Sequence, residues 1–178
     1  MLDGIYQAVA YLGTWQKQQA HPDIKVGNPA FTAKDCDVII LGGGDTGNDC
    51  IGTSLRQGAR SITTFEILPP PPTSRASDNP WPQWGRVFKV DYGHEEVKVK
   101  FGKDPRLYNT MSKEFVDDGK GSVSGILTVQ VEWNKNADGK WIMTEVPNSE
   151  KVTNIFFSND LIRNFNYSNN CFVTVVQV

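Results

Sequence analysis

The stretch that decides the fold is residues 37–47, DVIILGGGDTG, in which a short apolar run ends in a cluster of glycines. The run from Val38 to Leu41 suits a strand that is buried on both faces, as parallel strands are. Gly42, Gly44 and Gly47 fill the positions of the G-x-G-x-x-G fingerprint. There the first glycine permits a tight turn, the second lets a pyrophosphate approach the backbone, and the third lets the following helix pack closely. The stretch predicts the phosphate-binding turn of a dinucleotide-binding fold.

The chain after the glycines follows the order of helix and second strand that the fingerprint requires. Residues 46–57 predict a helix that Gly58 ends as a C-cap, with these apolar residues buried: Cys50, Ile51 and Leu55. Residues 61–68 predict the second strand. Near its end stands Glu66, about 20 residues beyond the glycines, where this fold places an acid that accepts hydrogen bonds from the adenosine ribose.

The predicted nucleotide site combines the turn with this acid. Glu66 meets the ribose, and the pyrophosphate lies on the turn formed by Gly42, Gly43, Gly44, Asp45, Thr46 and Gly47. Amides at the helix N-terminus and the positive end of the helix dipole hold the phosphates without a lysine. Asp45 has an equally supported alternative role, which is to cap the helix through its carboxylate. Because a carboxylate at Glu66 repels a 2′-phosphate, we expect NADH to bind better than NADPH.

The ends of the chain and the proline-rich segment give weaker patterns. Residues 2–19 predict an amphipathic helix packed on the main domain, with these residues on the buried face: Ile5, Tyr6, Val9 and Leu12. Residues 21–32 predict a connector rich in turn formers. The tract at residues 69–82 predicts a polyproline II excursion over the surface. Its aromatic neighbours predict that this loop packs onto its own domain: Trp81, Trp84 and Tyr92.

The second half of the chain changes to a strand pattern. Residues 93–100 predict a helix, and residues 107–118, 122–134 and 140–147 predict three strands of a β-meander. Asp138–Gly139 supplies a pair that is favoured in tight hairpin turns. The predicted fold class is therefore α/β, a Rossmann-like dinucleotide-binding domain with a β-meander, of the pyridine nucleotide-disulfide oxidoreductase kind.

Composition narrows the function classes. The 178 residues carry a net charge of −2, which gives no basic surface for nucleic acid, and no apolar run approaches the roughly 20 residues that span a bilayer. Cys36, Cys50 and Cys171 lack C-x-x-C spacing, so neither a disulfide framework nor a metal site is expected. The first residues lack the pattern of a secretory signal. The expected location is the cytoplasm, with organellar targeting of a longer parent protein left open.

Longer strings carry a more specific resemblance. Four strings carry it: GGGDTGNDCIGTSLRQGARSITTFEILPPPP at residues 42–72, NPWPQW at 79–84, KVDYGHEE at 89–96 and KFGKDPRLYNTMSKEF at 100–115. Over residues 36–151 the chain resembles the pyridine-nucleotide-linked glutamate synthases, in their small subunit or the corresponding C-terminal region of the fused enzyme. The resemblance implies an NAD(P)H domain inserted within a larger flavin-binding domain.

The resemblance also implies an activity and partners. In such enzymes a hydride passes from the nicotinamide to FAD, and electrons then pass through iron–sulfur clusters to FMN in the glutamate-forming portion. There 2-oxoglutarate and glutamine-derived ammonia become glutamate. No catalytic acid or base is predicted in this chain, because the hydride chemistry belongs to the cofactors. The implied partners are the nicotinamide dinucleotide, the flavin domain and the glutamate-forming portion, with FAD and iron–sulfur clusters expected only in the complete enzyme.

The chain departs from the family pattern after residue 151. The predicted plan is a lead-in helix and connector at 1–34, the NAD(P)H-binding domain at 35–151, and a divergent tail at 152–178 that is truncated or irregular. Within the tail, residues 172–178 are strongly β-prone and are expected to add a strand or to drive aggregation. With no second G-x-G-x-x-G, this chain alone is expected not to sustain NADH oxidation. Two alternatives stay open, another flavin-dependent NAD(P)H oxidoreductase and a non-catalytic nucleotide-binding fragment.

Overall fold

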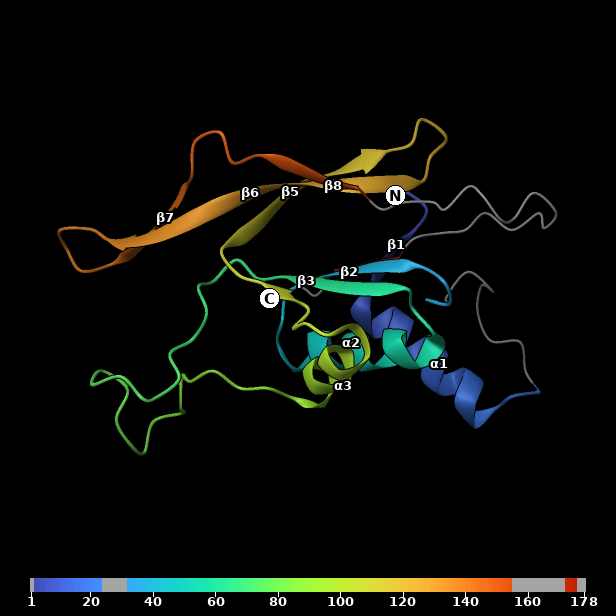
Figure 1. Cartoon of the computed structure of the whole chain (residues 1–178), viewed down its shortest axis with the longest axis horizontal. Helices are drawn as coiled ribbons and strands as arrows, with labels where there is room; N and C mark the ends of the chain where they lie inside the picture. Colours follow the sequence, from blue (N-terminus) through green and yellow to red (C-terminus); the bar gives the residue numbers. More distant parts are fainter. Residues whose placement is uncertain (1, 24–31, 155–171, 176–178) are drawn as a thin grey trace.

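The computed structural model describes residues 2–23, 32–154 and 172–175, and it builds three layers. In chain order the elements are β1 Ile5–Gln7, α1 Ala8–Ala20, β2 Asp37–Leu41, α2 Asp45–Gln57, β3 Ser61–Phe65, α3 Tyr92–Phe101, β4 Arg106–Leu107, β5 Thr110–Asp117, β6 Val123–Lys135, β7 Trp141–Glu145, β8 Lys151–Asn154 and β9 Phe172–Val175. Figure 1 shows a parallel sheet in the middle, the meander above it and the three helices below it.

The middle layer is a parallel sheet with the strand order β1-β9-β2-β3-β4. The meander is antiparallel, with β5 and β7 on either side of β6 and with β8 also paired to β6. The predicted α/β class, with a parallel sheet and an antiparallel meander, is confirmed. No helix of the described residues combines the length and apolar character needed to cross a bilayer.

Strand β2 is buried on both faces, and this explains its unbroken apolar sequence. Val38 and Ile40 pack with α1, α2 and α3 in one core cluster. Ile39 packs in a second cluster with Phe65 and with residues of β6. Full burial of one such side chain contributes about 1.5–3 kcal/mol to folding. The central strand therefore fixes the place of the glycine turn that follows it.

The predicted order of strand, turn, helix and strand is confirmed. Helix α2 begins at Asp45, one residue before the predicted start, and Gly58 ends it in the left-handed conformation with φ +92°. Cys50 and Ile51 are fully buried on its inner side, as expected. Strand β3 ends at Phe65 and not at the predicted Leu68, so Glu66 directly follows the strand.

The N-terminal segment differs from the predicted helix. Residues 5–7 form the short strand β1, which pairs in parallel with β9, and α1 begins only at Ala8. The pairing sets the helix phase, so that Ala8 and Tyr11 face the core while Val9 is 78% exposed. The predicted buried face was therefore wrong for Val9, whereas Ile5, Tyr6 and Leu12 are half-buried and pack against the core as predicted. The predicted packing on the main domain is confirmed, because the Tyr11 hydroxyl donates to Gln57 Oε1 of α2 at 2.8 Å.

The predicted helix and meander after the proline-rich segment are confirmed. Helix α3 covers the predicted residues 93–100 and adds one residue at each end. The turn between β6 and β7 is held by Asn136 Oδ1, which accepts hydrogen bonds from the backbone N–H groups of Asp138 and Lys140. Gly139 in this turn has φ +76°. Strand β8 was not predicted, and it spans the predicted boundary at residue 151.

The β-prone segment near the C-terminus adds a strand. Residues 172–175 form β9, which lies between β1 and β2 in the parallel sheet. The predicted connector at 21–32 lies largely outside the described residues, as do 155–171 and 176–178. The predicted division into lead-in, domain and tail stays a prediction.

The segment between β3 and α3 forms a long exposed loop, seen in green at the lower left of Figure 1. Its tryptophans do not pack on the domain as predicted, since Trp81 is 81% exposed and Trp84 is 80% exposed. The buried residue of the loop is Asn79, which is only 3% exposed and is polar. Hydrogen bonds of Asn79, and not aromatic packing, shape this loop.

Candidate dinucleotide-binding site

The glycine turn leaves β2 in a conformation that requires glycine. Gly42 has φ +92°, in the left-handed region that L side chains rarely adopt. Its N–H donates to the Phe65 carbonyl at 3.0 Å, which ties the turn to β3. A Cβ at Gly47 would overlap the Gly42 carbonyl oxygen, so α2 approaches the turn as closely as the backbone allows. Gly42 and Gly47 thus have the predicted structural tasks.

Gly44 is the open position of the turn. It is exposed, and a Cβ built on it would meet no atom within 4 Å. Its φ of −69° is accessible to any residue, so no backbone strain demands glycine here. Gly44 is the N-cap of α2, and the first amides of a helix have no acceptor within it. Free space therefore lies against the positive end of α2, which suits an anionic group.

Asp45 and Thr46 form the first residues of α2 and complete the predicted turn. The alternative role of Asp45 as a helix cap is wrong, because Gly44 occupies the N-cap and no side chain makes a capping hydrogen bond there. The side chain of Asp45 is exposed, whereas Thr46 is half-buried. Asp45 still stands in the first turn, where a negative charge interacts favourably with the helix dipole.

Glu66 lies against the glycine turn. Its N–H donates to the Leu107 carbonyl and its carbonyl accepts from the Thr110 N–H, both at 2.8 Å. Its carboxylate occupies the space that a Cβ at Gly43 would take, so Gly43 is the residue that lets this acid lie on the turn. Burial raises the pKa of the Glu66 carboxyl, and the positive charge of Arg106 partly opposes that rise.

Arg106 is a charged neighbour of this site that the sequence analysis missed. Its guanidinium donates to both Asp104 carboxylate oxygens, at 2.9 and 2.7 Å, and to the Lys89 carbonyl at 2.8 Å. It also lies 4.6 Å from the centre of the Phe88 ring. The sequence signal for Arg106 was weak, because its strand β4 has only two residues and shows no alternation of apolar and polar residues.

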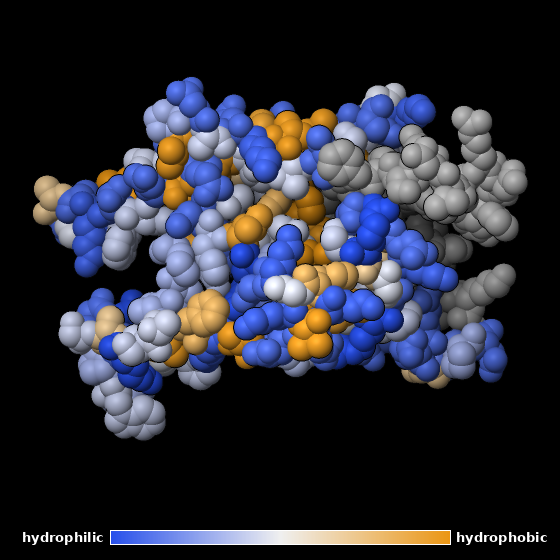
Figure 2. Space-filling view, viewed as in Figure 1, coloured by the Kyte–Doolittle hydropathy of each residue, from blue (hydrophilic) through white to orange (hydrophobic). Residues whose placement is uncertain are grey.

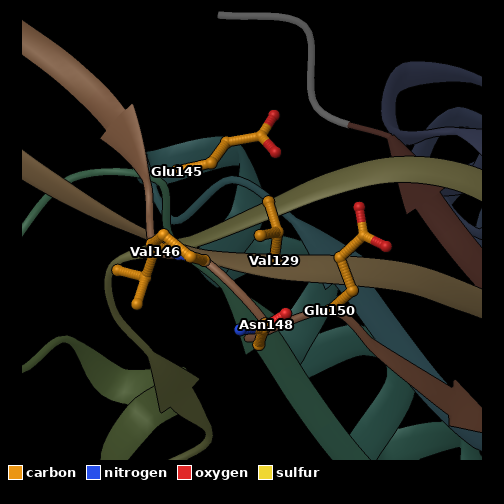
Figure 3. Close-up of a pocket in the computed structure, with 6 residues that line it drawn as sticks. Val129, Glu145, Val146, Asn148 and Glu150 are labelled. Carbon is orange, nitrogen blue, oxygen red and sulfur yellow. The ribbon is translucent and has the colours of Figure 1, made fainter.

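A separate hollow of about 520 Å³ lies on the meander and contains none of the predicted site residues. Figure 3 shows it with residues of β6, of the end of β7 and of the loop that follows. Lys113 donates to the carboxylates of Glu145 and Glu150 there, at 3.0 and 2.7 Å. This ion-pair cluster is exposed, and it suits the surface of a sheet better than a buried ligand site.

Cys50 of α2 matters for the alternative of another flavin-dependent oxidoreductase, because a reactive cysteine near the flavin would support that alternative. Its thiol is fully buried, and burial raises its pKa to about 12. A thiol in that state is protonated at neutral pH and is a poor nucleophile. Cys50 therefore has a packing role in the core of the domain.

Comparison with known proteins agrees with this arrangement. The chain is 51% identical over 159 residues to glutamate synthase [NADH] of Schizosaccharomyces pombe, and the match covers 89% of the chain and 7% of that relative. It is 60% identical over 115 residues to glutamate synthase [NADH] of Saccharomyces cerevisiae, covering 65% of the chain and 5% of the relative. Relatives named glutamate synthase thus match most of this chain. The chain corresponds to a small segment of these much longer proteins.

Small chains named glutamate synthase match as well. Glutamate synthase [NADPH] small chain of Bacillus subtilis is 40% identical over 149 residues, which cover 84% of this chain and 30% of the relative. The relatives thus include proteins named for NADH and for NADPH. No model of a protein family matches the chain.

The solved structures support the fold. FprA, an oxidoreductase of Mycobacterium tuberculosis, aligns with a TM-score of 0.54 at 12% identity, covering 98% of this chain and 45% of FprA. A structure titled as FprA in complex with NADPH aligns with the same TM-score at 11% identity. At this identity the likeness shows the shared fold alone.

Proposed function

We propose that this chain is the NAD(P)H-binding segment of a glutamate synthase-type oxidoreductase. The observation that carries the proposal is the combination of open space at Gly44 with the Glu66 carboxylate lying on Gly43. Both stand at the carboxyl ends of parallel strands, where open α/β sheets bind their ligands. The similarity to these relatives supports this oxidoreductase interpretation over a non-catalytic module.

The site residues fit a dinucleotide whose pyrophosphate lies at Gly44 and whose adenosine ribose lies at Glu66. The pyrophosphate lies in the space beside Gly44, where the amides of Asp45, Thr46 and Gly47 begin α2. The ribose of the adenosine half lies beside Glu66, whose carboxylate accepts its hydroxyl hydrogen bonds. The turn formed by Gly42 and Gly43 brings these two contacts together. When bound, the nicotinamide supplies a hydride, and this chain contributes its binding and orientation.

The remaining parts of the proposal concern the parent enzyme. The hydride acceptor is FAD in a flavin domain, and the electrons serve glutamate formation from 2-oxoglutarate and glutamine in another portion of the protein. NADH is the better ligand, since the Glu66 carboxylate repels the 2′-phosphate of NADPH. A cytoplasmic location belongs to the same proposal.

Titration calorimetry of NADH with Gly44→Val tests the proposal. A Cβ at this position meets no atom within 4 Å and the backbone is not strained, so we expect folding to be preserved while the valine side chain fills the space for the pyrophosphate. We expect NADH binding to fall at least about 100-fold, because the phosphates can no longer reach the helix amides. The matched control is Gly13→Val in α1, where a Cβ also meets no atom within 4 Å. Wild-type affinity in Gly44→Val would overturn the proposal.

A further inference from the structure

Two indole side chains of the loop between β3 and α3 are largely exposed. Trp81 is 81% exposed and Trp84 is 80% exposed, although tryptophan is a residue that proteins usually bury. An exposed indole offers a flat apolar face that suits contact with another planar group. The loop leaves the sheet directly after Glu66, and Figure 2 shows a notch in the surface between it and the β6–β7 hairpin.

The backbone that carries Trp84 is held on both sides. Asn79 Nδ2 donates to the Trp84 carbonyl at 2.9 Å, and Asn79 Oδ1 accepts from the Arg86 N–H at 2.7 Å. The Arg75 guanidinium donates to the carbonyls of Asn79 and Gln83, at 3.1 and 2.9 Å. A side chain on such a preformed loop binds a ligand with little loss of conformational entropy.

Contacts connect Trp84 to the proposed ribose site. The Lys89 ammonium lies 4.2 Å from the centre of the Trp84 ring, and the Lys89 carbonyl accepts from Arg106 at 2.8 Å. Arg106 in turn interacts electrostatically with Glu66. Arg106 belongs to β4, which pairs with β3 next to Glu66. Among residues 32–154 no cation lies over the ring of Trp81. The geometry thus distinguishes the two exposed indoles.

We propose that Trp84 stacks on the adenine ring of the bound dinucleotide. This inference rests on the proposed function, because it extends the ligand outward from the ribose at Glu66. Adenine is planar and matches the open face of the indole. Lys89, the cation beside Trp84, matches the anionic phosphates attached to the adenosine.

Ligands that contain different halves of NADH separate this role from a general effect on folding. ADP-ribose keeps the adenine and both phosphates, whereas reduced nicotinamide mononucleotide lacks the adenosine. For Trp84→Ala we expect the affinity for NADH and for ADP-ribose to fall by the same factor, about tenfold, as for the loss of one base–aromatic stack. Reduced nicotinamide mononucleotide should bind Trp84→Ala and wild type equally. Trp84→Phe should restore most of the lost affinity.

Two controls complete the test by calorimetry on the full chain. Trp81→Ala, on the same loop, and Trp141→Ala, 61% exposed on the meander, should both bind ADP-ribose as wild type does. Equal ADP-ribose affinity in Trp84→Ala and wild type would overturn the stacking role and leave the loop as a surface for a protein partner. A wild-type chain that binds neither NADH nor ADP-ribose would instead overturn the proposed function itself.

Discussion

Gly43 and Glu66 form the contact on which nucleotide selectivity depends in this account. A methyl group at residue 43 would occupy the place of the Glu66 carboxylate, which stands at the end of a flexible side chain and can move away. We therefore expect Gly43→Ala to fold normally but to lose selectivity. The ratio of NADPH to NADH dissociation constants should fall about three- to tenfold, because one nearby like charge is removed from the 2′-phosphate.

A double-mutant cycle gives the control for Gly43→Ala. Glu66→Gln alone should lower the same ratio, and Gly43→Ala in the Glu66→Gln background should change it no further. Additive effects of the two substitutions would show that residue 43 acts on selectivity by a route other than the carboxylate.

The charge of Glu66 makes selectivity depend on pH. Burial raises the pKa of this carboxyl above its ordinary value, so the carboxylate is present above the raised pKa and is lost as the pH falls through it. Repulsion of the 2′-phosphate should therefore weaken as the pH falls through this raised pKa. The phosphate itself titrates with a pKa of about 6. Glu66→Gln lacks the carboxylate, so its pH profile shows the contribution of the phosphate alone. Identical pH profiles of the ratio of NADPH to NADH dissociation constants in wild type and Glu66→Gln would refute the role of the carboxylate.

Helix α1 is attached to α2 by a buried polar contact as well as by packing. The Tyr11 hydroxyl lies 2.8 Å from Gln57 Oε1 and 3.1 Å from Ser54 Oγ, and the ring is 1% exposed. Gln57 Oε1 also accepts from the Ala33 N–H at 2.7 Å, so it keeps a partner when the hydroxyl is removed.

Tyr11→Phe should therefore lower the free energy of unfolding by about 1–3 kcal/mol, the value of two net hydrogen bonds. Tyr11→Ala should cost about 3–5 kcal/mol, since it also leaves a cavity. Urea unfolding followed by circular dichroism measures both. The matched control is Val9→Ala on the exposed side of the same helix, which should change the free energy by less than about 0.5 kcal/mol. A Tyr11→Ala variant as stable as the control would show that α1 does not contribute to the core.

The elements that local sequence could predict are those whose neighbours lie nearby in the chain. Strand β2, its glycine turn and α2 follow one another directly, and Gly58 carries its own stop signal. The helical phase of α1 could not be predicted, because it is set by the pairing of β1 with β9 from the other end of the chain. The loop after β3 was misjudged because the polar Asn79 holds it, while aromatic residues suggested packing.

Separation along the chain also explains which parts of the candidate site were predicted and which were missed. The glycines and Glu66 follow a known spacing, whereas the position of Glu66 on Gly43 is a side-chain contact that only the folded chain shows. Arg106 joins the site through β4, which pairs with β3 although a long loop and α3 separate the two strands in the chain. Trp84 was recognised as an aromatic residue near the proline tract, but its exposure was not expected.

For the molecule as a whole, the central claim is that NADH binds at the glycine turn and not in the hollow on the meander. Hydrogen exchange with and without saturating NADH, read by mass spectrometry on the full chain, tests this claim most directly. A bound pyrophosphate occupies the amides at the start of α2, so exchange should slow in peptides covering residues 42–49 and 61–66. Exchange in peptides covering residues 141–150 should not change. Slowed exchange at 141–150 with none at 42–49, or no change anywhere at saturating NADH, would contradict the account.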